Sequence, residues 1–219
     1  MLRLLFEKLD DAIWMSHLDL MRVFQRAFRR AGLMLKHSQG FTPRAIVSIA
    51  LPLSVGTESR CELLDFELEG ESVSCQEIQE RLNRNLTDGV RILDVYDEAA
   101  KLKHLAYLSC TVTMEYDAGV LSDAAERIRG LFASEELIVE KKGKNGIVEQ
   151  NIVPMILELQ VEEISSAELC LNALICCQNP TLNPAQLVAA IEKYLPHLQP
   201  SHARYCRNEI YTVNDKVFR

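Results

Sequence analysis

Six basic residues lie in a stretch of the chain that has no acidic residue. No Asp or Glu occurs from Leu20 to Thr57, although the whole chain has 31 acidic residues against 24 lysines and arginines and a net charge of −7. The remainder of the chain therefore has 18 cations against 31 acids, a charge of −13. Arginine binds phosphate and carboxylate groups through its planar fork of N–H donors. The stretch indicates an anion-binding surface, made by Arg22, Arg26, Arg29, Arg30, Lys36 and Arg44.

A second interpretation of these charges stays open. Solvated faces of proteins usually mix both signs, so the cations could instead pair with carboxylates elsewhere in the same chain. In that case they would stabilise the fold and bind no ligand. The sequence shows where the positive charge is concentrated, and both roles fit it.

Other residues could extend such a site. Ser38 and Gly40 could hold a phosphate with backbone N–H groups of their loop. Phe41 could stack on a base, as aromatic side chains do in proteins that bind single-stranded nucleic acids. Each of the three also fits a simpler role, in a turn or in the core. A second basic patch flanks a tight turn and fits a solvated tip equally well; it consists of Lys141, Lys142 and Lys144.

Candidate catalytic residues are few. His17 lies near Asp19 in the sequence and could be a general base or a metal ligand, but an imidazole there also fits a hydrogen bond to the backbone at a helix start. No Ser, His and Asp set can be assembled from the sequence. The catalytic residues are therefore unassigned, with His17 as a weak candidate.

A helix must position the first three arginines. Ser16 followed three residues later by Asp19 is a capping box, in which both side chains satisfy backbone N–H groups of the first turn. Gly32 can take the positive φ that commonly ends a helix. We predict one helix from Ser16 to Ala31, with the arginines on a separate face from its apolar stripe. The stripe consists of Leu20, Phe24, Ala27, Phe28 and Ala31.

The composition argues against several classes of protein. No apolar run approaches the ~20 residues that cross a bilayer, and the charged first residues do not resemble a signal peptide, so we expect a cytoplasmic protein without a membrane partner. No C-x-x-C spacing of a zinc or iron–sulfur site occurs. We therefore predict no metal, no cofactor, and seven reduced thiols, mostly buried. These are Cys61, Cys75, Cys110, Cys170, Cys176, Cys177 and Cys206.

The predicted elements follow the order β-α-β-β-α-β twice. In the first half, strands are predicted at residues 3–8, 45–51, 62–69 and 90–96. The strand at 62–69 alternates apolar and acidic residues, so we expect it to be half-buried, with Asp65 on its solvated face. Residues 13–15 are predicted to be extended, and the second helix is predicted to start at a capping box of Ser74 and Glu77 and to end at Gly89. In the second half, strands are predicted at 105–116, 155–163, 168–177 and 205–213, helices near 122–132 and after Asn183, and a hairpin at 137–153. We predict an α+β protein with tandem ferredoxin-like halves, residues 1–97 and 104–219, of which the second has the inserted β-hairpin. The first core is predicted to contain Leu20, Phe24, Phe28, Leu64, Phe66, Ile78 and Leu82.

Several runs of residues in the first half follow the pattern of one family. They are Ser16 to Phe24, Arg29 to Gly32, Ser38 to Pro43, Ala50 to Leu53, and Val55 with Gly56. On these residues the chain resembles the radical-SAM-linked bacterial family of unknown function that is catalogued as DUF2344. Because its members look like companions of radical SAM enzymes, fused to them or encoded beside them, the resemblance implies such an enzyme as the partner and no activity of this chain. Gln39 and Thr42 stand where the family pattern usually has an acid and an asparagine, which leaves this loop more basic.

Three functions fit these observations. In the first, the chain is a non-catalytic module that holds a polyanion, with RNA as the first candidate, for a radical SAM enzyme. In the second it processes or modifies RNA itself, like the CRISPR repeat-processing ribonucleases, which also have tandem ferredoxin-like halves. Those enzymes carry a glycine-rich loop near the C-terminus, whereas residues 180–219 here contain no glycine, so we favour binding. In the third, the chain is a protein–protein adapter only.

Overall fold

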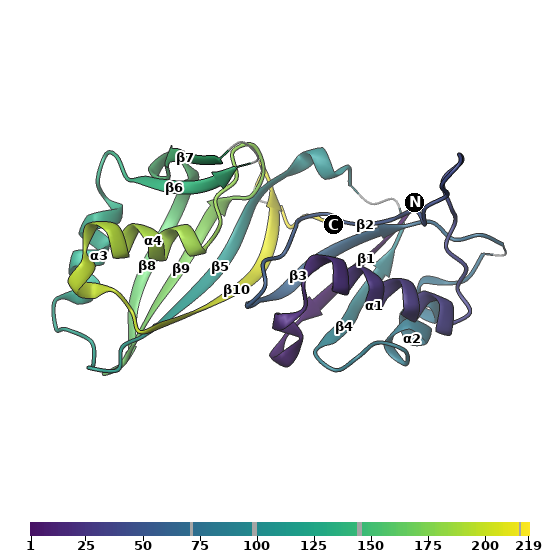
Figure 1. The fold of residues 1–219 in the computed structure, drawn as a ribbon, viewed down its shortest axis with the longest axis horizontal. Helices are drawn as coiled ribbons and strands as arrows, with labels where there is room; N and C mark the ends of the chain where they lie inside the picture. Colours follow the sequence, from purple (N-terminus) through teal and green to yellow (C-terminus); the bar gives the residue numbers. More distant parts are fainter. Residues whose placement is uncertain (71, 98–99, 144–145, 215) are drawn as a thin grey trace. The chain divides into compact units, whose positions relative to one another are not determined.

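The chain folds into two compact units. The computed structural model describes residues 1–70, 72–97, 100–143, 146–214 and 216–219. The first unit is Met1–Lys103 together with Arg219, and the second is His104–Phe218. Each unit packs helices against an antiparallel sheet (Figure 1), which confirms the α+β class.

The first unit has four strands and two α-helices among its described residues. They are β1 (Leu2–Lys8), α1 (His17–Arg30), β2 (Val47–Ile49), β3 (Thr57–Phe66), α2 (Cys75–Asn83) and β4 (Val90–Tyr96), with the 3-10 turn η1 (Asp10–Trp14) between β1 and α1. The strands lie in the order β4-β1-β3-β2, and each neighbouring pair is antiparallel. Both helices lie on the same face of this sheet (Figure 1). This arrangement leaves the outer face of α1 free for solvent.

The predicted capping box forms the start of α1. The Ser16 hydroxyl oxygen accepts a hydrogen bond from the Asp19 N–H at 3.2 Å and donates to the Asp19 carboxylate at 2.7 Å. The helix ends at Ala31, and Gly32 follows with φ +70°. The helix prediction for residues 16–31 is confirmed. The helix starts here because the cap satisfies N–H groups of the first turn, and it stops here because Gly32 adopts positive φ without steric cost.

The apolar stripe of α1 packs into the core that the sequence predicted. Phe24 is fully buried and meets Phe6 of β1 in an edge-to-face contact, with ring centroids 4.8 Å apart. Phe28 lies tilted against Phe66 of β3 at 4.9 Å. All seven residues predicted for the first core are buried: Leu20, Phe24, Phe28, Leu64, Phe66, Ile78 and Leu82. Burial of such side chains contributes roughly 1.5–3 kcal/mol each, so the stripe fixes which face of α1 carries the arginines.

The prediction of a half-buried strand at residues 62–69 is wrong. Strand β3 ends at Phe66, and both of its faces are buried from Cys61 onward. Its acidic residues are buried because they have partners: Asp65 lies opposite Arg3 of β1, at 2.6 Å, and Glu62 accepts a hydrogen bond from Ser59 at 2.8 Å. Alternation of acids with apolar residues therefore did not mean an exposed face here.

Three further boundaries differ from the prediction. Strand β2 has three residues, Val47–Ile49, where seven were expected. The backbone of the two residues before it is hydrogen-bonded to the segment that follows α1. Helix α2 ends at Asn83, well before Gly89. The residues before α1 form the 3-10 turn η1 instead of an extended segment, with Asp10 at φ +50°.

The second unit has two α-helices and six strands among its described residues. They are β5 (Leu105–Glu115), α3 (Ala124–Phe132), β6 (Ile138–Gly143), β7 (Gly146–Asn151), β8 (Ile156–Ser165), β9 (Glu168–Cys176), α4 (Ala185–Tyr194) and β10 (His202–Thr212). Four of these strands pair antiparallel in the order β10-β5-β9-β8, and β6 pairs with β7 as a separate hairpin. Both helices lie on one face of these four strands (Figure 1). The hairpin predicted at 137–153 is confirmed.

Candidate functional site

The exposed face of α1 carries arginines with and without partners. Arg22 donates to the Asp19 carboxylate at 3.0 Å. The hydrogen bond from the Ser16 hydroxyl, followed by the one from Arg22, lowers the pKa of Asp19 below its ordinary value. Arg26 and Arg29 are exposed, and neither makes a side-chain hydrogen bond or ion pair with any residue that the structure describes. These two guanidinium groups are therefore available to an anion.

The segment after α1, residues 33–47, forms a wall beside the helix and is called the rim segment below. Leu35 forms an antiparallel bridge with Leu68, and His37 forms one with Ala45. The Lys36 N–H donates to the Glu67 carbonyl at 2.9 Å, which ties the segment to the end of β3. Its side chains alternate, because an extended backbone points successive residues to opposite sides. Leu33 and Leu35 are buried, whereas Met34 and Lys36 are exposed. His37, nearer the turn, is also exposed.

Lys36 differs from the free arginines. Its ammonium group lies 2.8 Å from the Glu67 carboxylate. This hydrogen bond raises the pKa of Lys36 and lowers the pKa of Glu67. For Lys36, the structure therefore shows the pairing with a carboxylate of the same chain that the sequence left open. Lys36 therefore contributes less free positive charge than Arg26, Arg29 or Arg44.

Residues 38–44 form a closed turn that presents an aromatic side chain to solvent. The Ser38 N–H donates to the Arg44 carbonyl at 2.8 Å, and the Ser38 hydroxyl accepts from the Arg44 N–H at 3.1 Å. Gly40 has φ +136°, a conformation that other residues rarely adopt. Phe41 is fully exposed at 110% of its reference area. Phe41 is therefore not a core residue, and its ring is accessible for stacking on a base.

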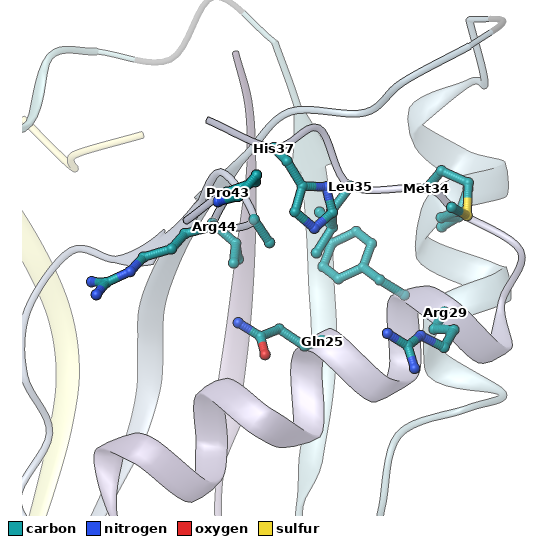
Figure 2. A pocket seen from close by; sticks show the side chains of 11 residues that line it. Gln25, Arg29, Met34, Leu35, His37, Pro43 and Arg44 are labelled. Carbon is teal, nitrogen blue, oxygen red and sulfur yellow. The ribbon is translucent and has the colours of Figure 1, made fainter. Parts of the chain in front are cut away.

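A pocket of about 480 Å³ lies between α1 and the rim segment. Its lining includes three buried apolar side chains, Phe28, Leu33 and Leu35. Gln25 and Arg29 come from the helix, and His37 and Arg44 come from the rim segment. Figure 2 shows Arg29 and Arg44 on opposite sides of the pocket, with Gln25 and His37 between them. No acidic residue lines it, so the pocket combines an apolar interior with a cationic edge.

The arginines of this pocket were predicted, whereas Gln25 and His37 were not. The sequence carries only a weak signal for the pocket wall, because Leu33, Met34 and Leu35 are three consecutive apolar residues without apolar–polar alternation. Such a short apolar run does not distinguish an extended segment from a helical one. Gln25 carried no signal, because an uncharged polar residue on a helix face is ordinary.

The hairpin lysines belong to the second unit. The Lys141 ammonium group donates to the Thr181 carbonyl at 2.9 Å, which attaches β6 to the residues before α4. Lys142 lies in β6, which pairs with β7. Lys144 lies outside the described residues. The structure thus gives Lys141 a structural partner within its own unit.

Among the described residues, His17 and the cysteines form no catalytic or metal-binding group. The Nδ1 atom of His17 is buried without a partner among the described residues, and no hydrogen bond joins His17 to Asp19, which is engaged by Ser16 and Arg22. Burial raises the pKa of Cys110 to about 12 and that of Cys177 to about 11, so both are thiols at neutral pH. Within the described residues, no three His, Cys, Asp or Glu side chains are grouped in a way that could hold a metal ion.

The comparison with protein families assigns the chain. The model of a family described as "Uncharacterized protein conserved in bacteria (DUF2344)" matches residues 1–184. The chain belongs to this family. No curated protein matches this DUF2344 member. Among its described residues, no helix is both long enough and apolar enough to cross a membrane.

A solved structure resembles this DUF2344 chain in fold. A chain in the crystal structure of a Cbf5-Nop10-Gar1 complex is similar over 95% of this chain with a TM-score of 0.51 and 9% sequence identity. This chain spans about half (48%) of the length of that one. An unknown protein from Galdieria sulphuraria is 10% identical, with 97% of both chains covered and a TM-score of 0.27. At such identities the first likeness concerns the fold alone.

Proposed function

We propose that this DUF2344 chain is a non-catalytic module that binds a polyanion, and that the polyanion is RNA. The observation that carries the proposal is the set of exposed arginines without a partner among the described residues: Arg26, Arg29 and Arg44. Arg29 and Arg44 line a pocket without acids, and Arg26 lies one turn before Arg29 on α1. Each guanidinium group can bind a phosphate through two N–H donors.

RNA is favoured over a simple anion by the aromatic side chain beside the cations. Phe41 is fully exposed on the turn that Arg44 closes. Proteins that bind single strands combine a basic groove with aromatic rings on which bases stack. A small anion such as phosphate would use the arginines and leave Phe41 without a role.

The strand order supports a framework for such binding. When the strands of each unit are numbered in chain order, with the hairpin β6–β7 left out, they lie in the order fourth, first, third, second in both units. We interpret the two units as the tandem ferredoxin-like halves predicted from the sequence, with the first unit as the binding half, in a cytoplasmic protein.

Salt titration tests the binding. If Arg26, Arg29 and Arg44 each contact one phosphate of a single strand, log affinity falls against log salt with a slope of about −0.7 per contact, roughly −2 in total. The double variant Arg26→Ala/Arg29→Ala should weaken binding of a labelled oligouridylate and flatten the slope by about 1.4. Its fold should persist, because neither residue lies on the apolar stripe. Fluorescence anisotropy at increasing salt measures both quantities.

Arg91→Ala is the matched control. Arg91 is an exposed arginine of the same unit, on β4, and it has no side-chain partner among the described residues either. Its replacement removes one positive charge, against two in the double variant, at a position on β4 instead of α1, and should leave the slope unchanged. Absence of binding at low salt, or an equal change of slope in the control, would contradict the proposal.

We further propose a radical SAM enzyme as the partner of this chain, because the resemblance of its first half is to a radical-SAM-linked family. The tagged chain should then retain one such enzyme from a lysate of its own organism, at comparable amounts and after treatment with nuclease. Mass spectrometry of the retained proteins identifies it. Retention that disappears with nuclease would mean that RNA, and no direct contact, links the two proteins.

A further inference from the structure

The pocket between α1 and the rim segment has features that a phosphate-binding surface does not need. Phe28, Leu33 and Leu35 are buried side chains that line it, and the Phe28 ring is held by Phe66 at 4.9 Å. The opposite wall is fixed by the bridges Leu35–Leu68 and His37–Ala45. The cavity is therefore formed by core residues and hydrogen-bonded backbone, so that it is present before any ligand arrives.

The size and chemistry of the pocket suit a small planar group. About 480 Å³ falls within the roughly 300–1,000 Å³ of small-molecule sites. A base in a duplex is stacked and paired and could not enter such a cavity, whereas a base in a single strand could. Gln25 offers an amide donor and acceptor, and His37 offers ring nitrogens, at the edge of the apolar interior (Figure 2). These are the groups that hydrogen-bond the edge of a base.

The charge around this pocket distinguishes it from other hollows of the described surface. Arg29 and Arg44 flank it, and no acid lines it. A hollow beside the start of α2 carries Glu67 and Asp97, and one over the sheet of the second unit carries Glu158. An anionic ligand is therefore attracted to the pocket of α1 and repelled by the acids of these two hollows.

We propose that this pocket receives one unstacked base of a single-stranded RNA, while Arg29 and Arg44 contact the phosphates on either side of that nucleotide. Phe41 then stacks on a neighbouring base outside the pocket. The inference rests on the proposed function, and it adds that the ligand is single-stranded and that a base, not only the backbone, is bound. A peptide with an apolar residue and a free carboxylate is the competing ligand. The two flanking arginines carry two positive charges, whereas a peptide terminus offers one carboxylate, so two phosphates match the pocket better.

Abasic strands provide the test. An oligouridylate and an abasic strand of equal length carry the same phosphates, so the salt slope should be the same for both. Affinity for the base-bearing strand should be higher by about a hundredfold, because the base in the pocket and the base on Phe41 each give an effect of about tenfold. The double variant Gln25→Ala/His37→Ala should reduce this preference to about tenfold, the share of Phe41, and leave the binding of the abasic strand unchanged.

The control variant is Gln76→Ala/His104→Ala, which replaces the same residue types at exposed positions outside the pocket. It should keep the preference for bases. Circular dichroism checks that each variant is folded. Equal affinity of the wild-type chain for both strands overturns the inference and leaves phosphate binding intact, whereas failure of the proposed function shows as no binding of either strand. Displacement of the oligouridylate by acetyl-leucine at lower concentration than by uridine monophosphate would also overturn it and assign the pocket to a peptide terminus.

Discussion

Arg3 and Asp65 form a buried ion pair that joins two neighbouring strands of the first unit. The guanidinium donates two hydrogen bonds to the carboxylate, at 2.6 and 3.0 Å, and a third to the Ala100 carbonyl at 2.8 Å. Their side chains are 3% and 10% exposed. The pair therefore links β1, β3 and the segment that leaves β4. Its charges have little contact with water, so each depends on the other.

Asp65→Asn tests this dependence. The change keeps the shape and removes the charge, so that Arg3 stays buried without its counter-ion, at a cost of about 3 kcal/mol or more in the free energy of unfolding. Trp14 is the single tryptophan of the chain and lies in the first unit, so its fluorescence during urea unfolding follows this unit. Glu80→Gln is the matched control. Glu80 pairs with Arg84 at 3.5 Å on an exposed helix face, where loss of the charge should cost less than about 1 kcal/mol. A similar cost for both variants would mean that the buried pair contributes no more than a surface pair.

At the scale of elements, caps and turns decide where helices start and stop. Ser74 repeats at α2 the capping seen at α1, with its hydroxyl accepting from the Glu77 N–H at 3.2 Å. The connection from α2 to β4 then passes Gly89, whose φ is +77° and whose carbonyl accepts from the Leu9 N–H at 2.8 Å. A Cβ on Gly89 would lie 2.5 Å from the Leu9 carbonyl oxygen and 2.8 Å from the Ala12 Cβ. The turn thus requires glycine for two independent reasons.

Gly89→Ala and Gly130→Ala should change stability in opposite directions. At Gly89 the positive φ costs roughly 1–2 kcal/mol and the overlap with backbone adds about 1–3 kcal/mol. Gly130 lies inside α3, has no positive φ, and a Cβ there would meet nothing within 4 Å. Alanine should stabilise that helix by about 0.5–1 kcal/mol, since it loses less backbone freedom on folding. Thermal unfolding followed by circular dichroism measures both, and a stabilised Gly89→Ala variant would refute the account of this turn.

Across the whole molecule, the charge limits how a nucleic acid could bind. The net charge of −7 means that most of the surface repels phosphates. Residues 104–219 have 10 basic against 15 acidic residues, and residues 1–103 have 14 against 16. Under the proposed function, binding of a polyanion therefore depends on the unpaired arginines of the acid-free stretch, Arg26, Arg29 and Arg44, and their replacement should have a large effect.

Several features follow from local sequence alone. Ser16 with Asp19, Ser74 with Glu77, and Gly32 determined the ends of helices, because a cap depends on residues within one turn. The apolar period of α1 determined which of its faces is buried, and thereby that its arginines face solvent. The acid-free stretch, read without any structure, contains Arg29 and Arg44 of the pocket. The domain boundary near residues 97–104 stays a prediction, as does the binding role of every residue of the site.

Contacts between distant residues decided the rest. Asp65 was expected on a solvated face, and it is buried because Arg3, 62 positions away, lies opposite it in the sheet. Lys36 was grouped with the free cations, and Glu67 neutralises it from the end of β3. The pocket exists only because residues 33–47 return along the open side of α1 and bring His37 and Arg44 beside Gln25 and Arg29. Local rules fix backbone conformation and the direction of side chains, whereas a charge partner or a cavity wall arises from chain segments that meet only after folding.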